Sequence, residues 1–274
     1  MSVTITAADI NKLRQATGAG MLDCRKALTE SNGDFEAAID WLRKQGQKVA
    51  AKRSDREAKE GVVIAQTTAD NKSGIVLCVS AETDFVSNNA EFVAFVKSIA
   101  DAAIANNVNS AEELNEVVIN GAKVSDMIND KLAAIGEKIG ITRFEKINAP
   151  YVASYIHGAN RMGVLVALTK VAPEAGKDVA MQIAAMNPLA VDESSIAPET
   201  IAREKEIAIE QIKAEGKPAE MAEKIAVGKV NKFLKDNTLI HQPFVKDNGK
   251  SVADYLKSID ADLKVIEFKR VALG

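Results

Sequence analysis

The sequence predicts an α+β protein with three parts: a three-helix module, a core in which a ββα…β pattern occurs twice, and an inserted helical hairpin. Apolar residues recur at helical spacing in residues 1–46 and alternate with period two from Gly61 onward. Helical spacing returns in two charged segments between residues 199 and 236. Because the strands come as hairpins followed by helices, we expect antiparallel sheets.

Composition limits the function classes. The chain has 274 residues, 47% of them hydrophobic, which is enough for two or three compact units. It carries 35 basic and 38 acidic residues, and this balance argues against a general nucleic-acid binder. Aromatic residues make up only 4%, so we do not expect a sheet of base-stacking rings.

Neither a targeting segment nor a metal site is expected. Residues 1–6 lack the charged start and apolar run of a secretory signal, and no stretch approaches a membrane-spanning helix. Cys24, Cys78, His157 and His241 lack the spacing of zinc ligands. We therefore expect a cytoplasmic protein with reduced thiols and no membrane association.

The first domain predicted is the three-helix module, residues 1–46. A polar N-cap begins its first helix, a Gly-rich turn ends that helix, and a second cap begins the third helix. The boundary signals, in order, are Thr6 with Asp9, residues 17–20, Asn32–Gly33, Asp34 and Gly46.

Residues 47–60 are predicted to be a linker. They have mixed charge and almost no large apolar side chains. Their basic cluster could contact an acidic partner, although a solvated helical linker is favoured. The cluster consists of Lys48, Lys52, Arg53, Arg56 and Lys59.

Residues 61–148 are predicted to be the first core subdomain. It should begin with a hairpin, continue with three helices and close with a strand. The strands are expected at Val62–Thr67, Gly74–Val79 and Ile141–Ile147, and the helices at Ala90–Ala105, 111–120 and 124–138.

The second core subdomain is predicted from residues 149–192 and 238–274, where the same layout returns. Gly163 follows Gly74 by 89 residues, and Phe268 follows Phe144 by 124, so this copy is longer before its last strand. Such offsets indicate a repeated supersecondary unit, although two generic ββα patterns could coincide. The expected elements are strands Tyr151–Ile156, Gly163–Leu168 and Val265–Val271 and a helix over 177–186.

The extra length is explained by a helical hairpin inserted at residues 193–237. Residues 199–215 and 219–236 are amphipathic and are joined by Gly216-Lys217-Pro218. Two interpretations stay open: a self-contained hairpin, or a surface for self-association that would give a homodimer or a 2:2 complex.

No catalytic pattern is present. The chain has no phosphate-binding loop, nucleophile elbow or HExxH sequence. The Gly-rich segment at residues 17–20 follows a helix, which favours an inter-helix turn. Asp84 and His157 could form an acid–base pair, but they lie in different repeats. We therefore expect no enzyme, no cofactor and no bound metal.

One segment differs between the repeats. Ala81–Asn89 contains Phe85 among polar residues, just before a predicted helix, whereas the second repeat has Pro173 and Glu174 at the matching positions. Phe85 could be a hydrophobic staple packing on its own helix, or an exposed anchor for a partner's pocket. The sequence leaves both interpretations open.

At this segment the chain resembles the elongation factor Ts family. Thr83-Asp84-Phe85-Val86 is similar to that family's TDFV motif, and Leu13–Leu28 is similar to its N-terminal signature. Further matching segments follow along nearly the whole chain: Gly33–Ala38, Trp41–Arg43, Ile135–Glu137, Tyr155–Gly158, Glu215–Pro218 and Gln242–Val245.

The resemblance implies a function as a guanine-nucleotide exchange factor for the GTPase elongation factor Tu (EF-Tu). Residues 1–46 would be a ubiquitin-associated (UBA)-like module that docks on the GTPase, and residues 193–237 its coiled-coil region. Thr83, Asp84, Phe85 and Val86 would disturb the switch region and displace Mg²⁺, with Phe85 as a wedge. The protein itself would bind no nucleotide.

Other EF-Tu contacts are implied at Arg14, Met21, Leu22, Ile135, Gly136, His157 and Val245. For His157, a polar residue at a hairpin turn is the competing interpretation. The alternative function is a UBA-type adaptor that binds another protein or RNA without exchange activity.

Overall fold

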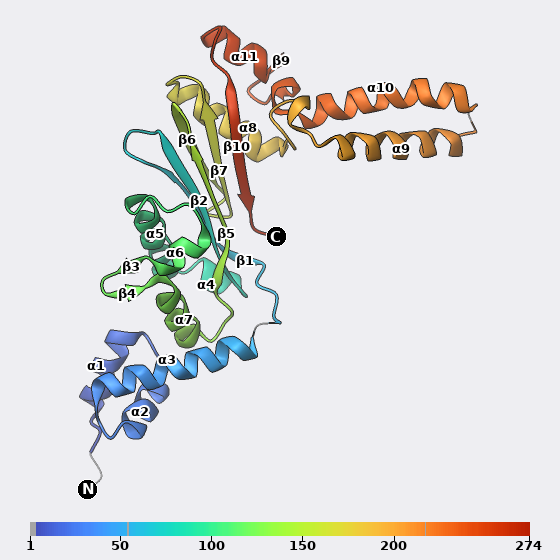
Figure 1. Ribbon diagram of the computed structural model, residues 1–274. Coiled ribbons are helices and arrows are strands. Elements are labelled where there is room, and N and C mark those ends of the chain that lie inside the picture. The colour runs from blue at the N-terminus through green and yellow to red at the C-terminus, as the bar shows by residue number, and fades with distance from the viewer. Residues whose placement is uncertain (1–3, 54, 217) are drawn as a thin grey trace.

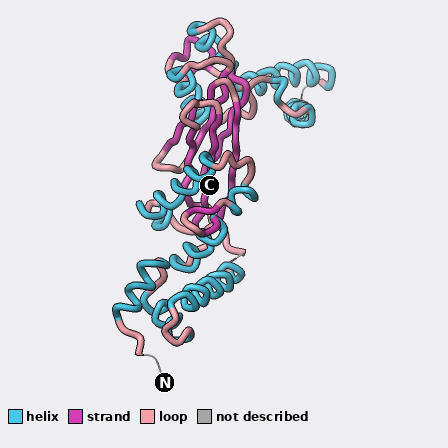
Figure 2. Tube along the Cα trace, turned by 60° about the vertical axis from the view of Figure 1, so that its left-hand side comes forward, coloured by secondary structure: helices cyan, strands magenta, loops and turns pink. Residues whose placement is uncertain are grey.

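The computed structural model describes residues 4–53, 55–216 and 218–274, which form an elongated molecule. The N-terminal helices lie at one end, a body of two sheets occupies the middle, and a helical hairpin projects sideways from the other end (Figure 1). The view in Figure 2 places the strands together between helices at both ends. The predicted α+β class with antiparallel sheets is confirmed. Within the described ranges, no helix is both long and apolar enough to cross a membrane.

The N-terminal helices are α1 (Ala7–Thr17), α2 (Met21–Glu30) and α3 (Phe35–Lys52). The Thr6 side chain accepts the N–H of Asp9 and the Asp9 carboxylate accepts the N–H of Thr6, so the predicted cap is a full capping box. Their small core consists of Ile10, Leu13, Ala19, Cys24, Ala27, Leu28, Ala38 and Leu42.

The third helix does not stop at Gly46, as the sequence suggested, but continues to Lys52. A Cβ at Gly46 would lie 2.7 Å from Ala133 Cβ, on a helix of the core body. The glycine therefore permits close packing between two helices rather than ending one. After Lys52 the chain leaves the helix, so the predicted helical linker is helical only in its first part.

The first sheet has the strand order β1-β2-β5, with β1 at Glu60–Thr67, β2 at Ser73–Ala81 and β5 at Gly140–Asn148. Helices α5 (Ala90–Ala105) and α7 (Val124–Ile135) share its core, where α5 contributes Phe92, Phe95, Val96 and Ile99. The range predicted for α5 is confirmed.

The predicted helix over 111–120 is wrong in its second half. Helix α6 (Ala111–Glu116) ends before a small hairpin formed by β3 (Val118–Ile119) and β4 (Ala122–Lys123). Asn120 and Gly121 between them have φ of 51° and 86°, the left-handed turn that an Asn-Gly pair adopts readily. Likewise α7 ends at Ile135 rather than 138, because Gly136 adopts the left-handed C-cap conformation.

The second sheet has the order β10-β7-β6, with β6 at Tyr151–His157, β7 at Met162–Leu168 and β10 at Val265–Ala272. Helix α8 (Pro173–Met186) packs against it and begins at Pro173, not at residue 177 as expected, since proline is favoured in the first helical turn. Elements that the sequence analysis missed precede β10: β8 (Pro243–Phe244), β9 (Asp247–Ser251) and α11 (Val252–Ile259).

The two sheets have the same topology, and their pairing registers fit the two sequence offsets. Leu77 pairs with Phe144 in the first sheet, and Val166 pairs with Phe268 in the second. Val166 follows Leu77 by 89 residues and Phe268 follows Phe144 by 124, the spacings found in the sequence.

The sheets pack face to face through a shared core. It contains Val63, Ala65, Val76, Cys78 and Ile147 from the first sheet and Val152, Leu165, Ala167 and Val271 from the second. Gly74 and Gly163 lie at this contact, and a Cβ at either would come within 2.9 Å of a valine of the other sheet. Their missing side chains allow the close approach.

The inserted hairpin consists of α9 (Pro198–Ala214) and α10 (Ala219–Asn237), preceded by a short 3-10 turn at Glu193–Ser195 and followed by another at Leu239–His241. Ala208, Ile212, Ala222 and Ala226 form a buried seam between the two helices. Lys217, in the predicted connection, lies outside the described residues.

Candidate functional site

Thr83-Asp84-Phe85-Val86 is not an irregular loop but the start of a single helical turn, α4 (Asp84–Ser87), which lies between β2 and α5. Thr83 is its N-cap, and the N–H of Asn88 donates to the carbonyl of Asp84 at 2.9 Å. The motif is therefore held in one defined backbone conformation.

The turn directs its residues in opposite directions. Phe85 is 87% exposed, although it is a large apolar side chain. Val86 is half-buried and packs against the first core, and Ser87 is buried. Phe85 thus does not act as a hydrophobic staple, and an anchor for something outside the chain remains.

The base of the turn is fastened by Glu137, from the segment that follows α7. Its Oε2 accepts the N–H groups of Glu82 and Thr83 at 3.1 and 3.0 Å, and its Oε1 accepts the Thr83 hydroxyl at 2.7 Å. One carboxylate therefore holds three donors at the entrance to the turn. Thr83 makes no side-chain cap to its own helix, because its hydroxyl is used here.

Glu82, which precedes the turn, accepts hydrogen bonds from the segment that contains Glu137 and from the linker. Its carboxylate accepts the N–H of Lys138 at 2.7 Å and the guanidinium groups of Arg53 at 2.7 Å and Arg56 at 3.0 Å. The Lys138 N–H, followed by the two arginines, lowers the pKa of the Glu82 carboxyl to about 2. It is therefore ionised at neutral pH, and the stability it contributes is lost as the pH falls from 4.5 toward 2.

Three members of the basic cluster predicted in the linker thus have partners within the chain. Arg53 and Arg56 bind Glu82, and Lys59 lies 2.6 Å from Glu57. The sequence analysis missed Glu82 and Glu137 as site residues. Their signal was the Ile135–Glu137 motif, but their contacts join residues more than 50 positions apart.

Two other predicted residues lie at the same place. Ile135, the last residue of α7, is partly exposed, and Gly136 has a φ of 78°. Both precede Glu137 directly in the sequence, so they lie beside the carboxylate that holds the turn.

The second sheet contributes a charged tip to this end of the body. Arg161 forms an ion pair with Glu60 at 2.7 Å, and Asn160 exchanges hydrogen bonds with the backbone of Val63. Glu60 and, to a smaller extent, Asp84 raise the pKa of Arg161. His157 is exposed on the same hairpin, with Nδ1 3.0 Å from the Tyr155 hydroxyl.

The remaining predicted contacts lie elsewhere. Arg14, Met21 and Leu22 are exposed on the N-terminal helices. Val245 is exposed beside β8, and its N–H donates to Gln182 at 2.8 Å. β8 leads into β9, which lies at the opposite end of the body from α4 (Figure 1). The structure therefore groups α4 with Ile135, Gly136 and the His157 hairpin, but spreads the others along the molecule.

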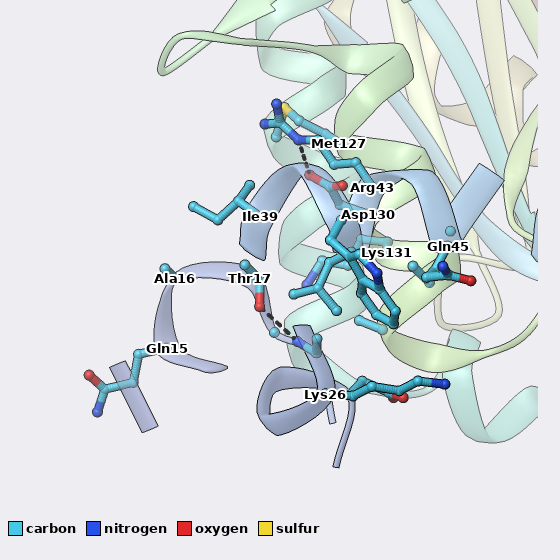
Figure 3. Close-up of a pocket in the computed structure, with 18 of the residues that line it drawn as sticks. Gln15, Ala16, Thr17, Lys26, Ile39, Arg43, Gln45, Met127, Asp130 and Lys131 are labelled. Atoms are coloured by element: carbon cyan, nitrogen blue, oxygen red, sulfur yellow. Dashed lines mark hydrogen bonds and ion pairs between the residues drawn. The ribbon is translucent and has the colours of Figure 1, made fainter. Parts of the chain in front are cut away.

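A cavity of about 690 Å³ lies between the N-terminal helices on one side and α5 and α7 on the other, beside the contact of α3 with α7. Figure 3 shows Thr17 and Lys26 on one side and Met127 and Asp130 on the other. Arg43 reaches across to Asp130, with Nε 3.8 Å from its Oδ2, and burial raises the pKa of that carboxyl. Across the described part of the chain, no group of three or more His, Cys, Asp or Glu side chains could hold a metal ion.

Comparison with known proteins gives consistent matches over nearly the whole chain. The family model described as elongation factor TS matches residues 82–274. Elongation factor Ts of Christiangramia forsetii is 50% identical, covering 98% of this chain and 99% of its own length. That of Flavobacterium psychrophilum is 52% identical, covering 99% of both chains, and that of Methylococcus capsulatus is 43% identical, covering 99% of this chain and 93% of its own.

Proposed function

The chain belongs to the elongation factor Ts family of translation elongation factors, and we propose that it acts as the guanine-nucleotide exchange factor for EF-Tu. In this role it accelerates GDP release during the elongation phase of protein synthesis. It changes no covalent bond and is therefore not an enzyme in the usual sense.

The observation that carries the proposal is the exposure of Phe85 on a fastened turn. In the free protein the Phe85 ring is 87% exposed, so its apolar surface gains no free energy from burial. That free energy is gained when a partner's pocket covers the ring. Because Glu137 and Val86 hold the turn from behind, little conformational entropy is lost when Phe85 binds.

The mechanism requires only differential binding. Mg²⁺ bridges the nucleotide phosphates and the GTPase, so a wedge that disturbs its ligands weakens nucleotide binding. A factor that prefers the empty GTPase is, by linkage, released when a nucleotide rebinds. Phe85 is the wedge in this proposal, Thr83, Asp84 and Val86 shape the turn, and this chain holds neither the nucleotide nor Mg²⁺.

The rest of the chain would form the docking platform. We assign Arg14, Met21 and Leu22 on a UBA-like module to one contact and Ile135, Gly136 and His157 to a second, around α4. Val245 would form a third contact at the far end. The two sheets, with equal topology, would be duplicated core subdomains. The hairpin of α9 and α10 would be free to contact EF-Tu or a second copy of the chain.

The direct test is the release of a fluorescent GDP analogue from preloaded EF-Tu. A substoichiometric amount of the full chain should accelerate release, with each molecule discharging many GTPases. Unchanged release at all concentrations of the chain would refute the proposal and favour a UBA-type adaptor without exchange activity.

A further inference from the structure

We propose that Glu137 and Glu82 are positioning residues whose carboxylates fix the direction in which α4 presents Phe85. This inference deepens the proposed function and rests on it, since it concerns how the exchange site is held. Neither carboxylate is exposed with Phe85, so neither is expected to touch EF-Tu itself.

The geometry for Glu137 is that of a fixed support. Both its oxygens are used, and all three donors lie at the two residues that lead into the turn. Hydrogen bonds to an ionised acceptor are stronger than neutral ones and sensitive to direction. Glu82 and Thr83 therefore have little freedom to rotate, and Phe85 follows only two residues later.

Glu82 fastens the same point to two other segments. It accepts the N–H of Lys138, which adjoins Glu137, so the segments 82–83 and 137–138 exchange hydrogen bonds in both directions. It also binds Arg53 and Arg56, which follow α3. The turn is thereby connected to the segment that leads from the N-terminal helices, which the proposed function places on the GTPase.

A purely structural role would predict something different. The first core already has a large apolar interior from β1, β2, α5 and α7, and Glu137 contributes no apolar group to it. Its loss should therefore disturb the turn more than the fold. The positioning role predicts that the effect of Glu137 on exchange depends on the presence of Phe85.

The first measurement is amide hydrogen exchange in the free full-length protein. Glu137→Ala removes the acceptor of all three donors, and should accelerate exchange of the Glu82 and Thr83 amides by about tenfold or more. Glu145→Ala, which removes a carboxylate bound to Lys269 at 3.3 Å, is the matched control and should leave these amides unchanged. Equal amide protection in the Glu137 variant and the wild type would show that Glu137 does not hold the turn, and would overturn the proposal whatever the rate of GDP release.

The second measurement is a double-mutant cycle on GDP release. Glu137→Ala should lower the maximal release rate about tenfold, and change the half-saturating concentration much less, because the other docking contacts remain. In a Phe85→Ala background the same substitution should change the rate less than about twofold. Equal losses in both backgrounds, or no loss in the wild-type background, would refute the positioning role.

The two failures are separable. If the wild-type chain does not accelerate GDP release, the proposed function fails. The amide exchange result still decides whether Glu137 holds the backbone of Glu82 and Thr83. If the wild type is active and the amides respond but the cycle is additive, the exchange function stands and the positioning role is overturned. Melting temperatures of all variants identify any loss that comes from unfolding alone.

Discussion

The two junctions between a hairpin and its following helix are the most informative comparison within this molecule. In the second sheet, β7 ends at Leu168 and α8 begins at Pro173. In the first sheet, β2 ends at Ala81 and α5 begins only at Ala90, and the extra length contains the turn α4. The first junction is therefore longer by about one helical turn, which carries Phe85.

In both sheets, the junction is held by hydrogen bonds or ion pairs to the segment that precedes the last strand of that sheet. In the second, Thr169 exchanges hydrogen bonds with Asp262 and Lys264, and Lys170 binds Asp260 at 2.8 Å. In the first, Glu137 and Lys138 play the corresponding part. Both junctions are thus held in a similar way, but of these two only the first carries a projecting aromatic side chain.

Replacing the exposed apolar residue of each junction should give the largest difference between the two junctions. Phe85→Ala should lower the rate of GDP release from EF-Tu by about thirtyfold or more, the loss expected when an interface hot spot is truncated. Val171→Ala removes an apolar side chain that is 73% exposed in the second junction and should leave the rate unchanged. Stopped-flow measurement with a fluorescent GDP analogue gives both rates.

Thermal unfolding provides the control for this pair. Because both side chains are exposed, neither substitution should change the melting temperature appreciably. Equal activity in the two variants would remove the functional difference between the junctions. A large loss of stability in Phe85→Ala would instead show that the ring packs on the protein.

Where the two sheets are alike, substitutions should behave alike. A Cβ at Gly163 would lie 2.9 Å from Val63 Cγ1 and 2.9 Å from Val76 Cγ2, and one at Gly74 would lie 2.9 Å from Val152 Cγ1. Each alanine variant should lose about 1–3 kcal/mol of unfolding free energy through overpacking, partly offset by reduced entropy of the unfolded chain. Urea denaturation measures the loss.

Gly140→Ala is the matched control for the glycine pair. It lies in β5 with nothing within 4 Å of a Cβ, so it should be neutral or slightly stabilising. If the Gly74 and Gly163 variants were as stable as this control, the close packing of the two sheets would not depend on the missing side chains.

The sequence predicted the long strands of both sheets and the helix α5 because their signals are local. Period-two alternation located the hairpins, and the helix Ala90–Ala105 was predicted with its observed bounds because apolar residues recur in it at helical spacing. Gly46 was misjudged because a glycine that ends a helix and one that admits a neighbouring helix look the same locally. Its meaning depends on Ala133, far along the chain.

The candidate site could be located from the sequence but not built. A staple and an exposed anchor have the same local pattern around Phe85, and only the fold decides which way the ring points. The fastening by Glu137 joins Thr83 to a residue 54 positions away. Such pairings follow from the position of β5 beside β2, which local periodicity does not contain.

The smallest effect is expected at the fastening of the second junction. Lys170→Ala removes ion pairs with Asp260 and Asp262 that are exposed to solvent, so it should lower the melting temperature by at most about 2 °C and leave GDP release unchanged.

The small difference in melting temperature between this variant and the wild type should depend on pH. Lys170 lowers the pKa of Asp260, so the contribution is present above the ordinary pKa of that carboxyl and is lost on acidification. Asp260 in turn raises the pKa of Lys170, so the contribution is also lost in strong alkali. Melting curves of the two proteins should therefore differ most near neutral pH and converge at both extremes, and also in high salt. If Lys170→Ala slowed GDP release as much as is expected for Glu137→Ala, both junctions would serve exchange, and the functional difference between them would be refuted.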